Sequence, residues 1–127
     1  MASFSTHSLR AIEAFTASLG LPPQPPARDG SFTFVFERSG KLSLTPTQDG
    51  ERALVSLARM PERTDAGRER RALARAGFNP TTGRYLHAGL AGDGSLIFAI
   101  ALDDGAFDLP TLEACLQELV AAHQDVA

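Results

Sequence analysis

The stretch Leu96-Ile97-Phe98-Ala99-Ile100-Ala101-Leu102 decides the fold, because it is apolar at both of its alternating sets of positions. A strand of this kind is expected to lie in the middle of a sheet and to be covered on both faces. Turn-forming residues stand on either side of it, Gly92-Asp93-Gly94 before and Asp103-Asp104-Gly105 after. We therefore predict that residues 96–102 form the central strand and that the rest of the chain packs around it.

The segments beside this strand predict a hairpin and a closing helix. Residues 84–90 have the composition of a strand, weakened near its end by Gly89, and the glycine-rich turn joins it to the central strand. After the central strand, Asp108 is a good N-cap, and Pro110 is tolerated in the first turn of a helix. The apolar stripe of that helix is Leu109, Leu112, Leu116, Leu119 and Val120, and residues 124–127 are expected to fray.

The first part of the chain predicts a helix followed by a meander. Residues 6–19 carry apolar side chains at helical spacing, with Ser5 or Thr6 as N-cap and Gly20 as the stop. Residues 22–26 are proline-rich and form either a stiff connector, which we favour, or a ligand for an SH3-type domain. Three strands follow, at 31–37, 41–45 and 52–60, and the first places Phe32, Phe34 and Phe36 on one face.

A second helix is predicted over residues 66–76, with Thr64 or Asp65 as its cap. It is rich in arginine and has only a narrow apolar seam, formed by Ala66, Leu73 and Ala76, with Phe78 just beyond it. So little apolar area cannot anchor a peripheral helix strongly. We expect this helix either to pack closely through its alanines or to gain burial from a partner.

The resulting order, α-β-β-β-α-β-β-α, predicts an α+β fold with an antiparallel twisted sheet of about five strands. The chain has 127 residues, of which 43% are hydrophobic and 21% charged, values ordinary for a globular protein. A chain of this length is the size of one domain, so we expect residues 1–127 to form one.

Charge and cysteine content narrow the class of protein. The net charge is −3, and seven of the twelve basic residues lie between Arg59 and Arg84. Cys115 is the only cysteine, so no disulfide can form within the chain, and a reducing compartment fits best. The N-terminus lacks the pattern of a signal peptide, and no apolar run is long enough to span a bilayer. We expect a cytoplasmic protein that does not insert into membranes.

Candidate catalytic, cofactor and metal groups are few in the sequence. His7, His87 and His123 have no metal-ligand spacing, and no cofactor motif is present. Cys115 and His123 are eight residues apart, roughly 12 Å along a helix, which is too far for a nucleophile and its base. The glycine-rich residues 89–94 lie between two strands, so they predict a turn and not a phosphate loop. Nucleic-acid binding is also disfavoured, because no aromatic residues are interleaved with the arginines.

Because catalytic, metal and nucleic-acid sites are disfavoured, exposed apolar surface is the remaining candidate for a functional feature. The meander and the first helix supply more apolar side chains than one sheet face under two helices obviously needs. A protein that binds extended segments of another chain shows such an excess.

The order of elements resembles the class I type III secretion chaperones, the Tir-chaperone family. The resemblance covers nearly the whole chain, and it departs from the family in its proline-rich connector and in the arginine content of the second helix. It is carried by residues 8–15 followed by Leu19-Gly20-Leu21, by the alternation from Phe32 to Phe36, and by residues 96–102 followed by 109–114.

This resemblance implies a homodimer that binds the N-terminal segment of a bacterial effector, keeps it extended and presents it for secretion, without catalysis, metal or cofactor. The implied effector surface is Leu9, Ile12, Phe15, Phe32, Phe34 and Phe36. The implied dimer interface is Ala66, Leu73, Ala76, Phe78, Tyr85 and Leu86. Two alternatives stay open: a regulatory protein-binding module of the same fold that acts on a secretion regulator, and a small ligand-binding domain or enzyme that uses the hairpin and Cys115.

Overall fold

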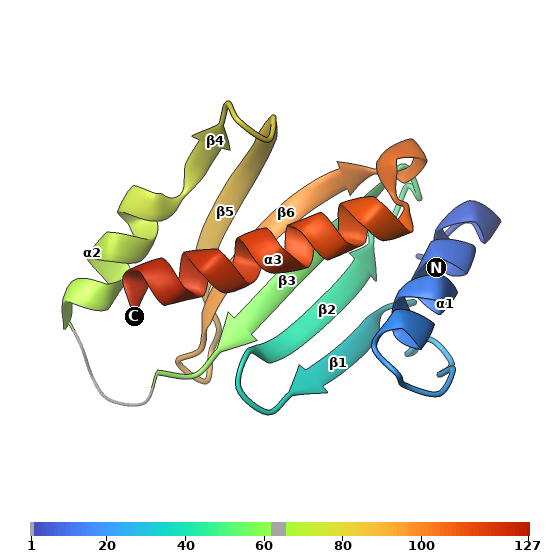
Figure 1. The fold of residues 1–127 in the computed structure, drawn as a ribbon, viewed down its shortest axis with the longest axis horizontal. Helices are drawn as coiled ribbons and strands as arrows, with labels where there is room; N and C mark the ends of the chain where they lie inside the picture. Colours follow the sequence, from blue (N-terminus) through green and yellow to red (C-terminus); the bar gives the residue numbers. More distant parts are fainter. Residues whose placement is uncertain (1, 62–65) are drawn as a thin grey trace.

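A computed structural model of the chain describes residues 2–61 and 66–127. Three α-helices, six strands and a short 3-10 helix follow one another along the chain (Figure 1). In order they are α1 (Thr6–Ser18), β1 (Phe32–Phe36), β2 (Gly40–Pro46), β3 (Arg52–Arg59), α2 (Ala66–Arg75), β4 (Gly77–Asn79), β5 (Arg84–Leu90), β6 (Leu96–Asp103), η1 (Asp104–Ala106) and α3 (Leu109–Val126).

The strands form one antiparallel sheet in the order β1-β2-β3-β6-β5-β4. The meander β1–β3 and the hairpin β5–β6 confirm the α+β prediction, but the sheet has six strands and not about five. The extra strand is β4, whose three residues pair with Arg84–Leu86 of β5. A strand this short has no alternation to detect, and it begins at Gly77, whose φ of 131° favours glycine.

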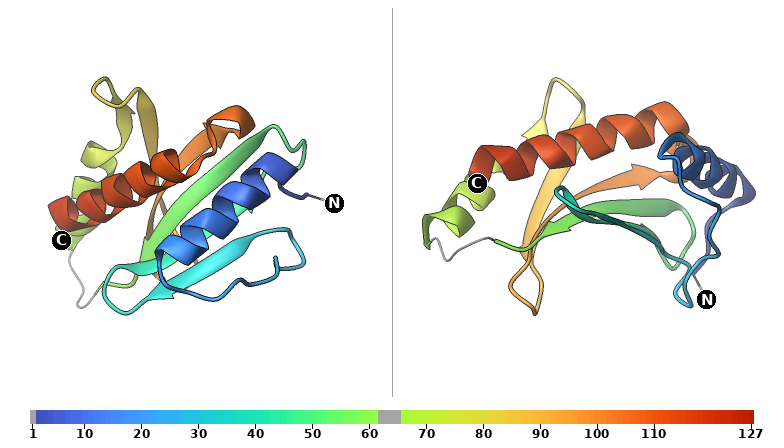
Figure 2. Two further views of the ribbon diagram at one scale, coloured as in Figure 1. Left: turned by 45° about the vertical axis from the view of Figure 1, so that its right-hand side comes forward. Right: turned by 60° about the horizontal axis from the view of Figure 1, so that its bottom comes forward.

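β6 is central, as predicted, because it pairs with β3 along its whole length and with β5 over its first half. The prediction that both of its faces are covered is wrong. Phe98 and Ile100 are fully buried under the helices, whereas on the opposite face Ala99 is buried but Ile97 and Ala101 are only half-buried. Within the described residues no helix lies on that second face (Figure 2). In this protein, apolar residues at both alternating sets of positions therefore indicate a central strand, but they do not indicate that helices cover both faces of it.

The helices α1 and α3 lie side by side on the covered face of the sheet (Figure 2). α1 packs over β1, where the rings of Phe15 and Phe34 meet edge to face with centroids 5.7 Å apart. α3 packs over β3 and β6 through its fully buried Leu112 and Leu119. The buried apolar side chains of sheet and helices form one cluster.

Two of the predicted helix caps are confirmed. The Ser5 hydroxyl accepts a hydrogen bond from the backbone N–H of Ser8 at 3.2 Å, and the Asp108 carboxylate accepts one from Thr111 at 2.9 Å. Each satisfies one of the N–H groups that the first turn of a helix leaves unpaired. The predicted caps of the second helix, Thr64 and Asp65, lie outside the described residues.

The end of α3 differs from the prediction that residues 124–127 fray. The helix continues to Val126, whose side chain is buried. The Arg71 guanidinium on α2 donates from Nε and Nη2 to the Val126 carbonyl at 3.0 and 2.9 Å. A cation at a helix C-terminus satisfies an orphan carbonyl and complements the helix dipole. The sequence of α3 alone does not reveal this, because the cap comes from α2.

Candidate functional site

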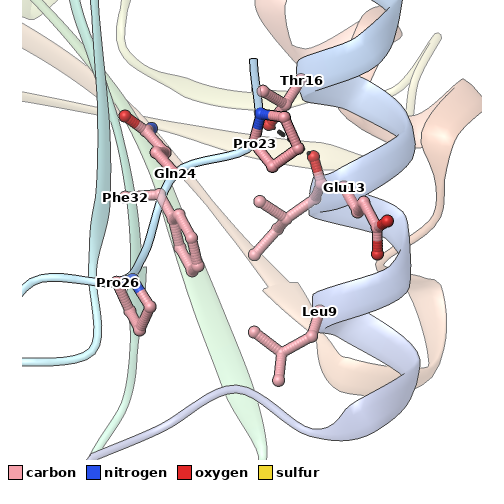
Figure 3. A pocket seen from close by; sticks show the side chains of 8 residues that line it. Leu9, Glu13, Thr16, Pro23, Gln24, Pro26 and Phe32 are labelled. Carbon is pink, nitrogen blue, oxygen red and sulfur yellow. Dashed lines mark hydrogen bonds between the residues drawn. The ribbon is translucent and has the colours of Figure 1, made fainter.

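An apolar hollow lies between α1, the proline-rich connector and the start of β1 (Figure 3). Its volume is about 210 Å³. We call it the α1 groove, and it is lined by Leu9, Ile12, Glu13, Thr16, Pro23, Gln24, Pro26 and Phe32. An apolar floor with a few polar groups at its rim is typical of a site that takes an apolar side chain of a ligand.

The structure separates the six residues predicted to contact an effector. Leu9 is 41% exposed and Phe36 is half-buried, whereas the other four are buried in the core, namely Ile12, Phe15, Phe32 and Phe34. Ile12 and Phe32 still line the floor of the α1 groove, but Phe15 and Phe34 pack against each other and line none of it. Alternation along a strand shows which side chains share a face, but it cannot show whether that face is covered.

A polar anchor fixes the N-terminal end of α1 beside the groove. The hydroxyls of Ser5 and Ser8 donate to the Asp104 carboxylate in η1 at 2.7 and 2.6 Å. These two hydrogen bonds hold the pKa of Asp104 below its ordinary value of 3.8. They join α1, which forms one wall of the groove, to η1, the segment between β6 and α3. The position of that wall therefore depends on where the central strand β6 ends.

The connector reaches back to the backbone of β1. Gln24 Nε2 donates to the Thr33 carbonyl at 3.2 Å, and the Ala27 N–H donates to the Ser31 carbonyl at 2.8 Å. The prediction of a segment without helix is confirmed for residues 22–26. The residues of the connector are exposed, so they form the outer wall of the groove.

A second apolar surface lies at the other end of the sheet, which we call the β4 edge and define by Leu73, Phe78 and Tyr85. These side chains are 72%, 63% and 51% exposed. Three more residues were predicted to belong to a dimer interface there. Ala66 is exposed and Ala76 half-buried, but Leu86 is buried in the core, because its side chain lies on the covered face of β5.

A second hollow adjoins the β4 edge. β5 pairs with β6 only over His87–Leu90, so the two strands diverge beyond that point. The space between them has a volume of about 350 Å³. Its lining combines Phe78, Tyr85 and His87 with Arg84 and the ion pair between Arg52 and Asp103.

Arginine contacts hold α2 and the β4–β5 hairpin to α3. Besides the cap from Arg71, the Arg75 guanidinium pairs with Asp125 at 3.0 Å, and Arg84 on β5 pairs with Glu118 at 3.1 Å. Ala72 is the one described residue of α2 that is buried, and it does not belong to the seam read from the sequence. The arginines therefore supply attachment that the apolar face of α2 lacks, a role that the sequence did not indicate.

Cys115 and His123 do not form a catalytic pair. Cys115 is fully buried, and burial raises the pKa of its thiol to about 11, so the nucleophilic thiolate does not form near neutral pH. His123 is also buried, its Nε2 lies 2.8 Å from the Leu57 carbonyl, and its ring stacks edge to face on Phe98. Burial lowers the pKa of His123, which keeps the ring neutral with its Nε2–H donating to Leu57. Both residues are thus part of the packing between α3 and the sheet.

The glycine-rich residues 89–94 form the end of β5 and the turn into β6, as predicted. The Ala91 N–H donates to the Ser95 carbonyl, and the Asp93 carboxylate accepts from the Ser95 N–H, both at 2.9 Å. In the described part of the chain, no three His, Cys, Asp or Glu side chains cluster as metal ligands would. No helix within those residues combines the length and the hydropathy that a bilayer span requires.

Three solved structures illustrate that the fold is shared. One is the Yersinia pestis type III secretion chaperone SycH in complex with a stable fragment of YscM2, with a TM-score of 0.72 and 17% identity over 96% of this chain and all of that one. A second is the ExsC–ExsE complex, with a TM-score of 0.74 and 17% identity over 96% of this chain and 92% of that one. A third is the HopA1–SchA chaperone–effector complex, with a TM-score of 0.66 and 21% identity over 93% and 94%.

Comparison of the sequence with curated proteins finds no match. A family model does match, and it covers residues 9–127, from the first turn of α1 to the end of the chain. The match includes the groove, the β4 edge and every strand, and it agrees with the fold and with the element order that the sequence predicted. The chain belongs to the family of the type III secretory system chaperone SycN.

Proposed function

We propose that this chaperone binds the N-terminal segment of a type III effector in the bacterial cytoplasm, keeps it extended and soluble, and presents it for secretion. The α1 groove carries this proposal, because it offers an apolar hollow beside the edge strand of a sheet. An extended segment binds such a place through side chains in the hollow and backbone hydrogen bonds to the strand. The protein acts by binding alone and uses no catalytic residue, metal or cofactor.

The solved relatives support a protein ligand. SycH was solved with a fragment of YscM2, and SchA with HopA1 in a chaperone–effector complex. The present chain has the same fold, and its groove is apolar and open. A segment that becomes ordered on binding loses conformational entropy, which burial of its apolar side chains in the groove offsets.

The experiment is co-expression with an effector or secretion protein encoded beside this gene, followed by co-purification and limited proteolysis. We expect a complex in which an N-terminal segment of the partner resists the protease. Leu9→Asp should weaken the complex by roughly 10- to 100-fold, the range expected when burial of one leucine side chain is lost.

Leu90→Asp is the matched control, because Leu90 is also exposed but lies at the end of β5, outside the groove. Equal weakening by both substitutions, or a protected segment far from the partner's N-terminus, would contradict the proposal. If the captured partner is a secretion regulator and not an effector, the same groove serves a regulatory module.

We further propose that two copies associate through the β4 edge. Three large apolar side chains are exposed there, Leu73 on α2, Phe78 on β4 and Tyr85 on β5, and Phe78 and Tyr85 are paired across the two strands. Large exposed apolar side chains that gather in one region are typical of a surface that a partner covers. A monomer by light scattering at micromolar concentration would contradict the homodimer.

A further inference from the structure

The proline-rich connector lies along the free edge of β1, and we call residues 21–27 the strap. β1 is the first strand in the sheet order and pairs only with β2. An edge strand presents unpaired N–H and C=O groups that can pair with a strand of another chain. What covers this edge therefore decides whether the edge is available.

The hydrogen bonds of the strap show which groups of β1 face outward. The Thr33 carbonyl accepts from Gln24, and the Ser31 carbonyl accepts from Ala27. In an antiparallel pair, the N–H and C=O of one residue point to the same side, and alternate residues point to opposite sides. The outward-facing backbone groups thus belong to residues 31, 33 and 35, and the strap meets the first two of them.

The strap follows β1 as a further strand would, but it cannot complete a ladder. Four of its seven residues, Pro22, Pro23, Pro25 and Pro26, have no backbone N–H to donate. Its bond to Thr33 comes from a side chain and not from the backbone. Pro23 and Pro26 lie opposite Leu9 and Glu13 of α1 (Figure 3). The strap thus bounds the groove and occupies the strand edge at the same time.

The strap is weakly attached. None of its residues is buried, so it contributes few buried apolar contacts of its own. Between its link to the helix end, where the Leu21 N–H donates to Thr16, and its link at Ala27, the hydrogen bond of Gln24 is the one described attachment. Segments with few buried contacts open at a low free-energy cost.

We propose that the strap is a displaceable guard: it covers the β1 edge in the unliganded chaperone and is displaced by the backbone of the bound segment. This inference rests on the proposed function, since it specifies how the groove is regulated. While the strap is closed, it keeps edge strands of separate copies from pairing. A ligand whose site is open for only a fraction of the time binds with its affinity reduced by that fraction.

The test compares the wild type with Gln24→Ala and with the control Gln48→Ala, which makes the same change at an exposed turn residue. Hydrogen exchange is followed by mass spectrometry on a fragment that contains Ala27, because the Ala27 N–H of the strap donates to the Ser31 carbonyl. We expect exchange at this amide to rise about two- to tenfold in Gln24→Ala, the range for the loss of one net hydrogen bond that holds the strap closed. The control should match the wild type, and all three proteins should have the same circular dichroism spectrum, which shows that Gln24→Ala remains folded.

A second measurement uses a fluorescein-labelled peptide that copies residues 31–37, an alternating segment able to pair with a strand edge. Its anisotropy should show binding to Gln24→Ala about two- to tenfold tighter than to the wild type or the control. Equal or weaker binding by Gln24→Ala, or unchanged exchange at Ala27, overturns the guard and leaves the strap as a fixed wall.

The proposed chaperone function and the proposed guard can be contradicted independently of each other. The exchange measurement uses the free protein, so the absence of any effector in co-purification would contradict the chaperone proposal and leave the guard standing. An effector that is captured normally while the exchange at Ala27 is unchanged contradicts the guard alone.

Discussion

The two ends of the sheet are held together by different kinds of contact. At the β1 end, α1 is attached through buried side chains such as Ile12 and Phe15, and Leu9 alone among its predicted contact residues is well exposed. At the β4 end, α2 buries Ala72 and is attached through Arg71 and Arg75. The first end therefore uses its apolar residues for folding, whereas the second leaves Leu73 and Phe78 exposed.

This difference shows that an apolar residue on a flanking helix has two possible uses. A helix whose apolar face is wide enough to attach it to the sheet buries most of that face in the core. Any groove beside such a helix is small. A helix docked by charged hydrogen bonds can keep its apolar side chains for a partner, because bonds between an arginine and a carbonyl or carboxylate are stronger than neutral ones. The predictions below test each end.

The largest expected effect is at the β1 end. Phe15→Ala should lower the free energy of unfolding by about 3–5 kcal/mol, because it removes a fully buried ring that packs on Phe34 and leaves a cavity. Urea denaturation followed by circular dichroism measures this. Leu9→Ala on the same helix should cost under about 1 kcal/mol, as is usual at a partly exposed position. A small effect at Phe15 would mean that this ring belongs to a binding surface and not to the core.

At the β4 end, Leu73→Asp should weaken association of the chain with itself by about 2 kcal/mol, as for a central interface residue. Sedimentation equilibrium measures the dissociation constant, which should rise about 30-fold. Val35→Asp is the control, since Val35 is 79% exposed on the open sheet face and far from α2 in the sheet order. Unchanged association in Leu73→Asp would remove the β4 edge as the interface.

Attachment of α2 through arginine predicts a smaller effect. Arg71→Met should lower the free energy of unfolding by about 1–2 kcal/mol, because the Val126 carbonyl loses its cap. Hydrogen exchange should accelerate in the last turn of α3 and leave α1 unchanged. Arg70→Met, at an exposed position of the same helix, should have no such effect. Equal exchange in the two variants would show that the cap contributes nothing to α3.

The smallest effect concerns pH and the junction between α3 and β3. Burial lowers the pKa of His123 in the folded protein below its ordinary value of 6.5, and the nearby Arg59 and Arg68 lower it further. The unfolded chain therefore binds more protons than the folded chain as the pH falls through this value. The stability from neutral His123 is present above pH 6.5 and is lost below it, with a slope of at most about 1.4 kcal/mol per pH unit.

Urea denaturation between pH 5 and about pH 7 checks this slope. His123→Gln should flatten it, whereas Gln48→Ala, which changes an exposed side chain that does not titrate, should leave it unchanged. Five aspartates do not interfere, because hydrogen bonds lower their pKa values below 3.8 and their contribution is lost only in more acidic solution: Asp29, Asp49, Asp93, Asp104 and Asp108. A slope that persists in His123→Gln would assign it to another group.

Local patterns in the sequence were sufficient for most of the fold. Alternation located β1, β2 and β3, strand composition located β5, and a continuous apolar run located β6. The capping residues Ser5 and Asp108 marked the starts of α1 and α3. These signals work because caps and alternation are properties of neighbouring residues. β4 was missed because its three residues carry no pattern and owe their conformation to the pairing with β5.

The candidate sites depended on contacts between distant residues, and the sequence predicted them only in part. The alternation of Phe32, Phe34 and Phe36 fixed their common face, but only α1 lying on that face made Phe34 core. Likewise, the arginine-rich sequence of α2 predicted a charged helix. That Arg71 caps α3 follows only from the position of the Val126 carbonyl in the folded chain.

The sequence by itself determined the three helices, five of the strands and which side chains share a face, because these follow largely from periods of two and 3.6 residues along the chain. The tertiary structure alone decided which face is covered, which apolar residues remain for a partner and what the proline-rich strap rests against. Those outcomes depend on packing between segments far apart in the sequence, such as Gln24 against Thr33 and Arg71 against Val126, and no local period encodes them.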